Sequence, residues 1–146
     1  FRRQLQMAVE NQLPVQMHTR DAEDDTIEIL KEFDGKVRGV IHCFTGTQKL
    51  ADEVLKLGLN LSISGVVTFK NAENLREIVR NTPIERLHVE TDAPFLTPVP
   101  FRGKKNQPAF VVHVAEKVAE IKNLSMEQLA NHTRQNAFEV FHRLQN

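Results

Sequence analysis

The sequence lacks several features that would place the protein in a special class. Its 146 residues include one cysteine, Cys43, which excludes an internal disulfide and suits a reducing compartment. No apolar run approaches the roughly 18 residues that a membrane-spanning helix needs. There is no GxSxG, P-loop, GxGxxG or paired-cysteine motif, and no linker. The common signatures of serine hydrolases, nucleotide-binding folds and thiolate metal sites are therefore missing.

The chain also lacks a net charge. Nineteen basic residues balance nineteen acidic ones, and 40% of the residues are hydrophobic, as in a folded globular protein. Any nucleic-acid binding must rest on a local site, because no overall positive field exists to supply it. The length fits one domain, so we treat residues 1–146 as a single unit.

Four short apolar runs are expected to be β-strands. They cover residues 13–18, 37–44, 59–65 and 87–92. Their ends, at His18, His42, Ser64 and Asp92, are 24, 22 and 28 residues apart. This is the length of one repeated strand–helix unit, which predicts a parallel sheet.

Amphipathic periodicity predicts helices around these strands. The expected helices are an opening one that ends before Pro14, residues 22–33, 48–57 and 72–80, one from Pro108, and one from a capping box at Ser125. Asn71 is a candidate cap, Gly58 a residue that follows a helix end, and Thr133 a place where the last helix is expected to break.

The number of strands bears on the fold class. A closed (β/α)8 barrel takes about 250 residues, whereas four strand–helix units fill this chain. The strands carry polar residues at their C-terminal ends, which a barrel mouth tolerates better than an open sheet buried on both faces. The pattern therefore predicts an α/β fold, either a small open sheet or half of a TIM-type barrel.

The segment over residues 89–94, which reads Val-Glu-Thr-Asp-Ala-Pro, is the most informative stretch. Alternate strand residues face the same way, so Glu90 and Asp92 share a face, with Asp92 at the strand's C-terminal end. α/β enzymes place metal ligands and general bases there. Glu90 is expected to orient a metal ligand from behind, or alternatively to pair with Arg86 or Arg102.

Two histidines occupy positions that match that of Asp92. His18 and His42 end earlier strands of the predicted parallel sheet. A lone strand histidine is more often a hydrogen-bonded core residue, but all three side chains at one rim favour a metal site. Imidazole and carboxylate suit Zn²⁺, Mn²⁺ or Mg²⁺. Such an ion would lower the pKa of bound water and neutralise charge on an ester or phosphoester oxygen.

Basic side chains lie next to these residues in the sequence. Arg20 could clamp a phosphate, although a solvated charge at a helix start fits nearly as well. The proline-rich loop over residues 98–108 carries Arg102, Lys104 and Lys105, and we interpret it as phosphate-binding.

The remaining candidates are interpreted as structural. Phe101 could stack on a base, but packing is the expected use. Cys43 is expected on the opposite face of its strand from His42, as a buried and inert thiol. The histidines away from the rim, which are His88, His113, His132 and His142, are expected to be structural or solvated.

Five segments together resemble the TatD family of metal-dependent deoxyribonucleases, and its YcfH-type branch most closely. They are Met17–Ala22, Ile41–Gly46, Ser62–Gly65, Glu90–Leu96 and Arg102–Pro108. The resemblance implies a (β/α)8 barrel of the amidohydrolase type and a cytoplasmic hydrolase of DNA phosphodiesters. It also implies that His18, His42 and Asp92 are metal ligands and that Asp92 helps to activate the attacking water. Arg20 and Arg102 are candidates for substrate binding.

The sequence departs from the family pattern in one respect. The family has a His-x-His on the first barrel strand and a metal-bridging glutamate on the fourth, and neither is found here. We therefore expect the chain to hold the C-terminal half of the barrel, with part of the ligand set. Its expected partners, besides DNA, are the missing N-terminal half or a second copy bound through exposed strand edges.

Three functions remain open from the sequence. The first is a metal-dependent phosphodiesterase acting on DNA, which the basic loop favours. The second is an amidohydrolase-type enzyme for small esters, amides or lactones. The third is a catalytically inactive half barrel that serves in binding or assembly.

Overall fold

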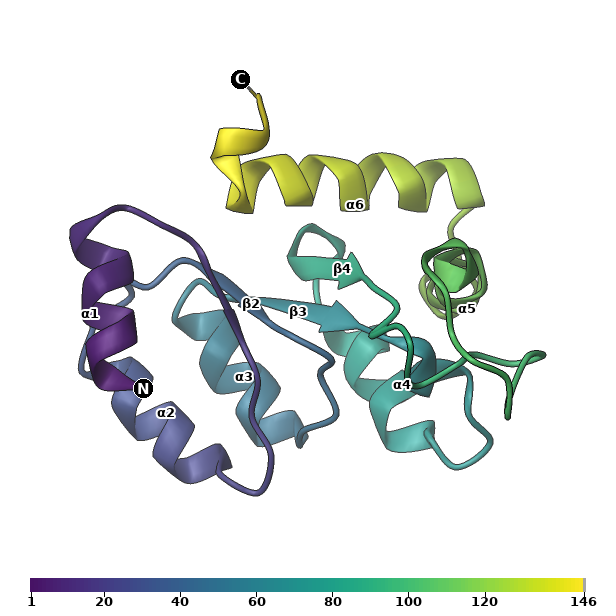
Figure 1. The fold of residues 1–146 in the computed structure, drawn as a ribbon, viewed down its shortest axis with the longest axis horizontal. Helices are drawn as coiled ribbons and strands as arrows, with labels where there is room; N and C mark the ends of the chain where they lie inside the picture. The colour runs from purple at the N-terminus through teal and green to yellow at the C-terminus, as the bar shows by residue number, and fades with distance from the viewer. Residues whose placement is uncertain (146) are drawn as a thin grey trace.

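Four short strands form one parallel sheet in the computed structural model, which describes residues 1–145 (Figure 1). The strands are β1 (Val15–Met17), β2 (Gly39–Ile41), β3 (Asn60–Ile63) and β4 (Leu87–Val89). Their order in the sheet is β1-β2-β3-β4, the same as their order in the chain. Every neighbouring pair is parallel, which confirms the prediction of repeated strand–helix units.

Helices precede, connect and follow the strands. They are α1 (Arg2–Glu10), α2 (Glu23–Lys31), α3 (Gln48–Lys56), α4 (Glu73–Asn81), α5 (Val111–Lys122) and α6 (Met126–Val140), with 3-10 turns η1 (Gly65–Thr68), η2 (Ile84–Arg86), η3 (Pro108–Phe110) and η4 (His142–Gln145). A strand, a helix and a parallel neighbouring strand make the unit of a (β/α)8 barrel. The fold is of this barrel type, represented by four of its strands. Within residues 1–145, no helix combines the length and the apolar character that crossing a membrane requires.

Two details of the helices differ from the sequence-based expectations. Helix α6 runs through Thr133 without a break, because the threonine hydroxyl donates to the carbonyl of Leu129 at 3.0 Å and stays satisfied inside the helix. Helix α4 has Ala72 as its N-cap, and no side chain caps it, so Asn71 is not the cap.

Two other helix boundaries are confirmed. The Ser125 hydroxyl accepts from the backbone N–H of Gln128 at 3.1 Å, and the Gln128 side chain accepts from the Ser125 N–H at 2.9 Å. This reciprocal pair is the predicted capping box at the start of α6. Gly58 follows α3 with φ +84°, a left-handed conformation that glycine adopts without steric strain.

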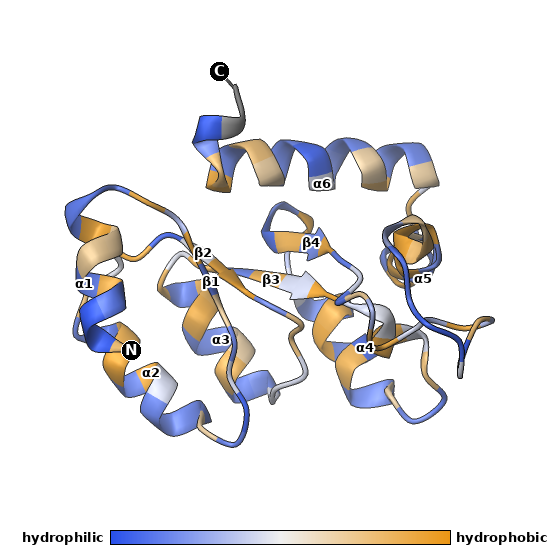
Figure 2. Cartoon of the chain, in the orientation of Figure 1, coloured by the Kyte–Doolittle hydropathy of each residue, from blue (hydrophilic) through white to orange (hydrophobic). Residues whose placement is uncertain are grey.

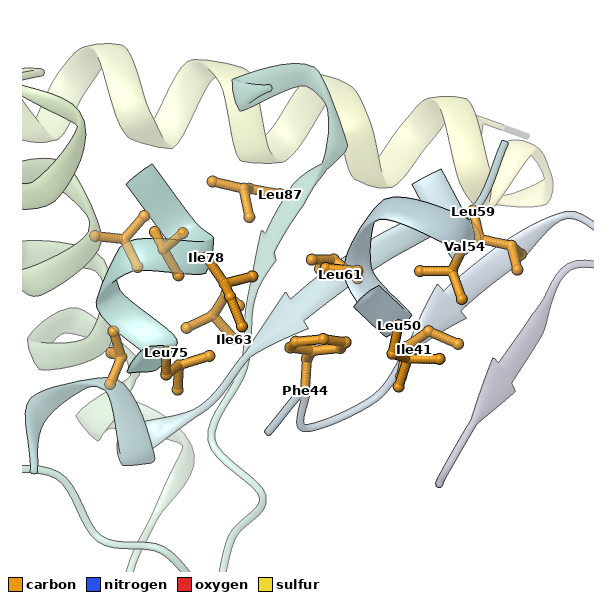
Figure 3. Packing of buried hydrophobic residues seen from close by; sticks show 14 of the residues in the cluster. Ile41, Phe44, Leu50, Val54, Leu59, Leu61, Ile63, Leu75, Ile78 and Leu87 are labelled. Carbon is orange, nitrogen blue, oxygen red and sulfur yellow. The ribbon is translucent and has the colours of Figure 1, made fainter. Parts of the chain in front are cut away.

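One face of the sheet forms the hydrophobic core with the helices. Figure 3 shows the strand residues Ile41, Leu61, Ile63 and Leu87 packed with Leu50 and Val54 of α3 and with Leu75 and Ile78 of α4. Phe44, just beyond β2, fills the centre of this layer and is 1% exposed. Figure 2 shows hydrophobic residues concentrated along the strands and the helix surfaces that face them. This layer fixes the strands whose ends carry the candidate site.

The opposite face of the sheet carries mostly polar side chains. The register places Gln16 beside Val40 and Ser62 beside His88, so these residues share this face. Helix α6 crosses the beginning of β4 (Figure 1), where Asn136 donates to carbonyl oxygens of η2 and β4. The polar face and the C-terminal strand ends are therefore the part of the molecule where functional side chains can gather.

Candidate metal centre

The loops at the C-terminal ends of the strands hold an unusual share of strained backbone. His18 and His42 directly follow β1 and β2, and Asp92 lies three residues after β4. Asp92 itself has φ +57°, while Cys43 and Asp21 in the other two loops have φ +46° and +53°. A non-glycine residue held there costs about 1–3 kcal/mol and persists only where its surroundings impose it. Such strain gathers at functional sites, so this rim is the candidate centre.

His42 lies between two carboxylates. Its Nδ1 atom is 2.8 Å and 3.0 Å from the two oxygens of Glu90, and its Nε2 atom is 3.1 Å from Oδ1 of Asp92. The Ser62 hydroxyl donates to Glu90 at 2.5 Å, and the Gln16 amide lies 3.0 Å from His42 Nδ1. These contacts bring together residues from or beyond all four strands. Glu90 and Asp92, which were predicted to share a strand face, both lie beyond the end of β4 and both contact this imidazole.

The carboxylates determine where the imidazole carries its hydrogen. Glu90 can only accept, so Nδ1 serves this contact when it is protonated and donates to the carboxylate; the amide nitrogen of Gln16, itself a donor, then makes no hydrogen bond to Nδ1. In the neutral ring the Nε2 lone pair then points at Asp92 Oδ1, only 3.1 Å away. Two lone-pair-bearing atoms at this distance need a cation between them, either a proton or a metal ion. A carboxylate behind a ligating histidine is the usual arrangement around protein metal sites.

One oxygen of Glu90 has no hydrogen bond. Oε1 is buried and, despite its 2.8 Å distance from His42 Nδ1, has no hydrogen-bond partner of acceptable geometry. Buried carboxylate oxygens without a partner are costly and concentrate negative charge. The donor set and this excess of negative charge both fit a divalent cation, which Asp92 and Nε2 of His42 would hold.

His18 lies at the same rim but does not contact His42 or Asp92. Its ring centroid is 6.1 Å from that of His42, and its side chain is exposed. Over the described part of the chain, no three side chains of His, Cys, Asp or Glu converge closely enough to hold a metal ion. The structure thus joins two of the three predicted ligands, His42 and Asp92, and places the third beside them.

The predicted phosphate-binding arginines lie in different surroundings. Arg20 is exposed at this rim, where its positive charge acts to lower the pKa of the Cys43 thiol. Arg102 is also exposed, but its guanidinium group lies 3.8 Å above the ring of Phe69 and donates to the carbonyl of Thr97 at 3.1 Å. Arg102 is therefore held between its own loop and Phe69 at the end of η1, and its position brings positive charge to the loop surface.

The alternative interpretation of Glu90 as the partner of an arginine is wrong. Arg86 instead donates to the carbonyl of Gly58 and to the side chain of Asn60, at 3.1 Å and 3.2 Å. The contacts of Glu90 are with His42 and with Ser62, as described above. The glutamate therefore belongs to the candidate metal centre and not to a surface ion pair.

The expected position of Cys43 is also wrong, whereas the raised pKa of its thiol agrees with the expectation that it is inert. Its Sγ atom is 3.1 Å from the Ser64 hydroxyl, and the side chain is half-buried at the rim. Burial raises the pKa of the thiol, and the carboxylates of Asp92 and Glu90 raise it further. The left-handed backbone at Cys43 ends the strand alternation, so the side chain turns toward the centre instead of toward a helix.

Two aromatic residues of the loop after β4 have different environments. Phe101 stacks on Phe110 with ring centroids 4.5 Å apart, as the packing interpretation predicted. Phe95 is 68% exposed, which makes it the most exposed large hydrophobic side chain among those described. Sequence reasoning missed Phe95, although its position three residues after Asp92 was a usable signal.

His88 has the structural role that its sequence position predicted. It is buried on the polar face, with Nε2 2.9 Å from the Asn60 amide. Burial lowers the pKa of His88 from 6.5 to about 4, because the charged ring cannot be hydrated there.

The low pKa of His88 predicts that acid destabilises the fold. The unfolded chain binds a proton near pH 6.5 and the folded one only near pH 4, so stability is complete above pH 6.5 and falls as the pH drops toward 4. Between pH 7.5 and 4.5 the loss is expected to reach up to about 2.5 kcal/mol. Urea unfolding at the two pH values, with His88→Gln as control, measures it. Equal pH dependence of the two proteins would contradict the assignment.

Comparisons with known proteins agree with this architecture. The family model described as TatD related DNase matches residues 1–142. The "uncharacterized metal-dependent hydrolase YabD" of Bacillus subtilis is 48% identical over 142 residues, which are 97% of this chain and 56% of that protein. The "uncharacterized metal-dependent hydrolase YcfH" of Escherichia coli K12 is 49% identical over 145 residues, 97% of this chain and 54% of that protein.

A solved structure gives the same result at the level of the fold. The crystal structure of YjjV, a TatD homolog from Escherichia coli K12, superposes with a TM-score of 0.88 at 28% sequence identity. The match covers 95% of this chain and 54% of that one. The chain thus spans about half the length of the curated relatives that it matches.

Proposed function

Because the chain belongs to the family of TatD related DNases, we propose that the protein is a metal-dependent hydrolase that cleaves phosphodiester bonds in DNA. Two of its relatives are named as metal-dependent hydrolases. The observation that carries the proposal is His42, held by Glu90 on one side and facing Asp92 with the other nitrogen. This is the arrangement of a metal ligand with its orienting carboxylate.

Each residue of the centre has a distinct role in the proposal. His42 and Asp92 would hold the ion, His18 would add a donor, and Glu90 would fix the tautomer of His42. When bound, the ion lowers the pKa of a water molecule and neutralises charge on the phosphoester. The Asp92 carboxylate would accept a proton from the attacking water. Mg²⁺, Mn²⁺ and Zn²⁺ all match these imidazole and carboxylate donors.

The anionic substrate is supported by the loop that follows Asp92. Arg102, Lys104 and Lys105 are exposed on it, in a protein whose charges otherwise cancel. The Thr97 hydroxyl donates to the carbonyl of Lys104 at 2.5 Å and fixes this part of the loop. Local positive charge on a braced loop is what phosphate groups of a nucleic acid need for binding.

Removing two of these charges is expected to reduce the salt dependence of DNA binding. For single-stranded DNA, the slope of log K against log salt is roughly −0.7 per neutralised phosphate. Lys104→Ala with Lys105→Ala should therefore make the slope less steep by up to about 1.4. Fluorescence anisotropy at several salt concentrations measures it. The control is Lys56→Ala with Lys117→Ala, two lysines paired with glutamates on helix surfaces. Identical slopes for both variants and wild type would contradict the role of the loop.

A competition assay tests the proposed activity itself. The full-length protein, stripped with a chelator and reloaded with Mn²⁺, is expected to release nucleotides from single-stranded DNA, and small carboxylic esters should not inhibit this release. If esters are hydrolysed and DNA is not, the enzyme is a small-ester hydrolase of the amidohydrolase type. If neither is hydrolysed, the chain belongs to an inactive member that serves in binding or assembly.

The two outer strands indicate how the barrel is completed. Both β1 and β4 pair with a strand on one side only, and paired edges are the rule in a barrel. We expect further strands of the full-length protein, or a second copy of this chain, to pair there. The single cysteine and the absence of a disulfide accord with a cytoplasmic protein.

A further inference from the structure

Asn106 makes a dense set of hydrogen bonds in the loop after β4. Its side chain is 4% exposed. The amide nitrogen donates to the carbonyls of Thr91 at 2.8 Å and of Phe95 at 2.6 Å. The amide oxygen accepts from the N–H of Gln107 at 2.9 Å, and the backbone N–H of Asn106 donates to the carbonyl of Pro94 at 3.1 Å. A single buried residue therefore fixes both ends of the segment 91–95.

Asp92 lies inside this segment in a strained conformation. Its φ of +57° is left-handed, and its carbonyl accepts from the N–H of Phe95 at 2.9 Å to close a turn. An aspartate prefers negative φ unless its neighbours hold it otherwise. The hydrogen bonds of Asn106 to Thr91 and Phe95 supply that restraint, one residue before Asp92 and three residues after it.

We propose that Asn106 is a positioning residue that holds Asp92 in the conformation in which its carboxylate meets Nε2 of His42. Asn106 has no hydrogen bond with His42 or with the Asp92 carboxylate, so it acts through the backbone alone. Without the two amide bonds, the turn relaxes to negative φ and the carboxylate leaves its 3.1 Å position. The effect on metal binding rests on the proposed function, whereas the effect on the contact between Asp92 and His42 does not.

The chain contains a matched control for this residue. Asn136 is 3% exposed, and its amide nitrogen also donates to two carbonyls, those of Ile84 and Leu87, both at 2.8 Å. It braces the beginning of β4, while Asn106 braces the turn beyond its end. No residue with positive φ lies between Ile84 and Leu87. Truncating either asparagine removes the same chemistry, but only one of them touches the segment that contains Asp92.

The primary experiment is a spectrum of the histidine rings in the metal-free, full-length protein. In Asn106→Ala the ring nitrogen signals of His42 are expected to shift, because Nε2 loses Asp92 as its neighbour. In Asn136→Ala they should stay at their wild-type positions, although both variants should melt several degrees below wild type. Asn106→Asp keeps the shape of the side chain but cannot donate, so it gives the same readout where the alanine variant does not fold.

A second readout connects the restraint to the proposed metal centre. Calorimetric titration with Mn²⁺ should give a Kd about 10- to 100-fold higher for Asn106→Ala than for Asn136→Ala, as is typical when an orienting partner of a ligand is lost. On DNA, kcat should fall for Asn106→Ala while KM stays unchanged. Unshifted His42 signals in both Asn106 variants would overturn the positioning role. If wild type binds no Mn²⁺ but the signals shift, the proposed function fails and the positioning role stands.

Discussion

Replacing His42 by alanine in the full-length protein is expected to lower kcat/KM for single-stranded DNA by about 10³-fold. The ring contacts both Glu90 and Asp92, and its loss leaves the two carboxylates without the imidazole between them. In the proposed mechanism several kcal/mol of transition-state stabilisation by the metal would depend on that ligand, and each 1.4 kcal/mol is about tenfold in rate. Steady-state assays with saturating Mn²⁺ measure the loss.

The control for this substitution is another histidine with a carboxylate partner. His113 on α5 lies 3.0 Å from Glu116 one turn further along the same helix, and its ring centroid is 5.2 Å from that of Phe101. His113→Ala should change kcat/KM less than about twofold. Asp92→Asn should act like His42→Ala, because the amide keeps the shape but carries no charge for the ion. Full activity of either His42→Ala or Asp92→Asn would contradict the proposal that these two residues hold a catalytic metal ion.

The fold could be predicted because its signals are local. The apolar runs are short and regularly spaced, and amphipathic segments separate them, so the strands and their parallel direction follow from the pattern. The strands in the structure are shorter than the predicted apolar runs, because only paired residues form a strand. For example, β2 covers only Gly39–Ile41 of the predicted segment 37–44. Thr133 was misjudged because the polarity of its side chain cannot reveal that its hydroxyl finds an acceptor within the helix.

The candidate site could be predicted in part, for a related reason. Alternation along parallel strands predicted that Glu90 and Asp92 share a face. Both residues lie beyond the end of β4, and they are joined instead by His42, which contacts both. Alternation fails where the backbone turns left-handed, and no sequence pattern announces such a turn at a non-glycine residue. That is why Cys43 was placed on the wrong face. The role of Asn106 could not be predicted either, because its hydrogen bonds to the backbone exist only once the loop has folded around it.

Replacing Phe44 by alanine is expected to lower the free energy of unfolding by about 3–5 kcal/mol. Phe44 is 1% exposed and lies against residues such as Ile41 and Leu50 in the layer between the sheet and α3 (Figure 3). Its removal loses the transfer free energy of the ring and leaves a cavity that a strand end and a helix cannot close by small shifts. Since single domains are stable by roughly 5–15 kcal/mol, this is a large fraction of the total. Urea unfolding followed by circular dichroism measures it.

Phe95→Ala provides the matched comparison, because the same ring is removed from a position that is 68% exposed. This change should alter the free energy of unfolding by no more than about 0.5 kcal/mol, since little packed surface is lost. Phe44 also follows His42 by two residues, and its N–H donates to the carbonyl of Ser62 at 2.9 Å. The buried ring therefore anchors the loop that presents the histidine. If the two phenylalanine variants were equally stable, the layer around Phe44 would not be close-packed, and the rim would not depend on it for support.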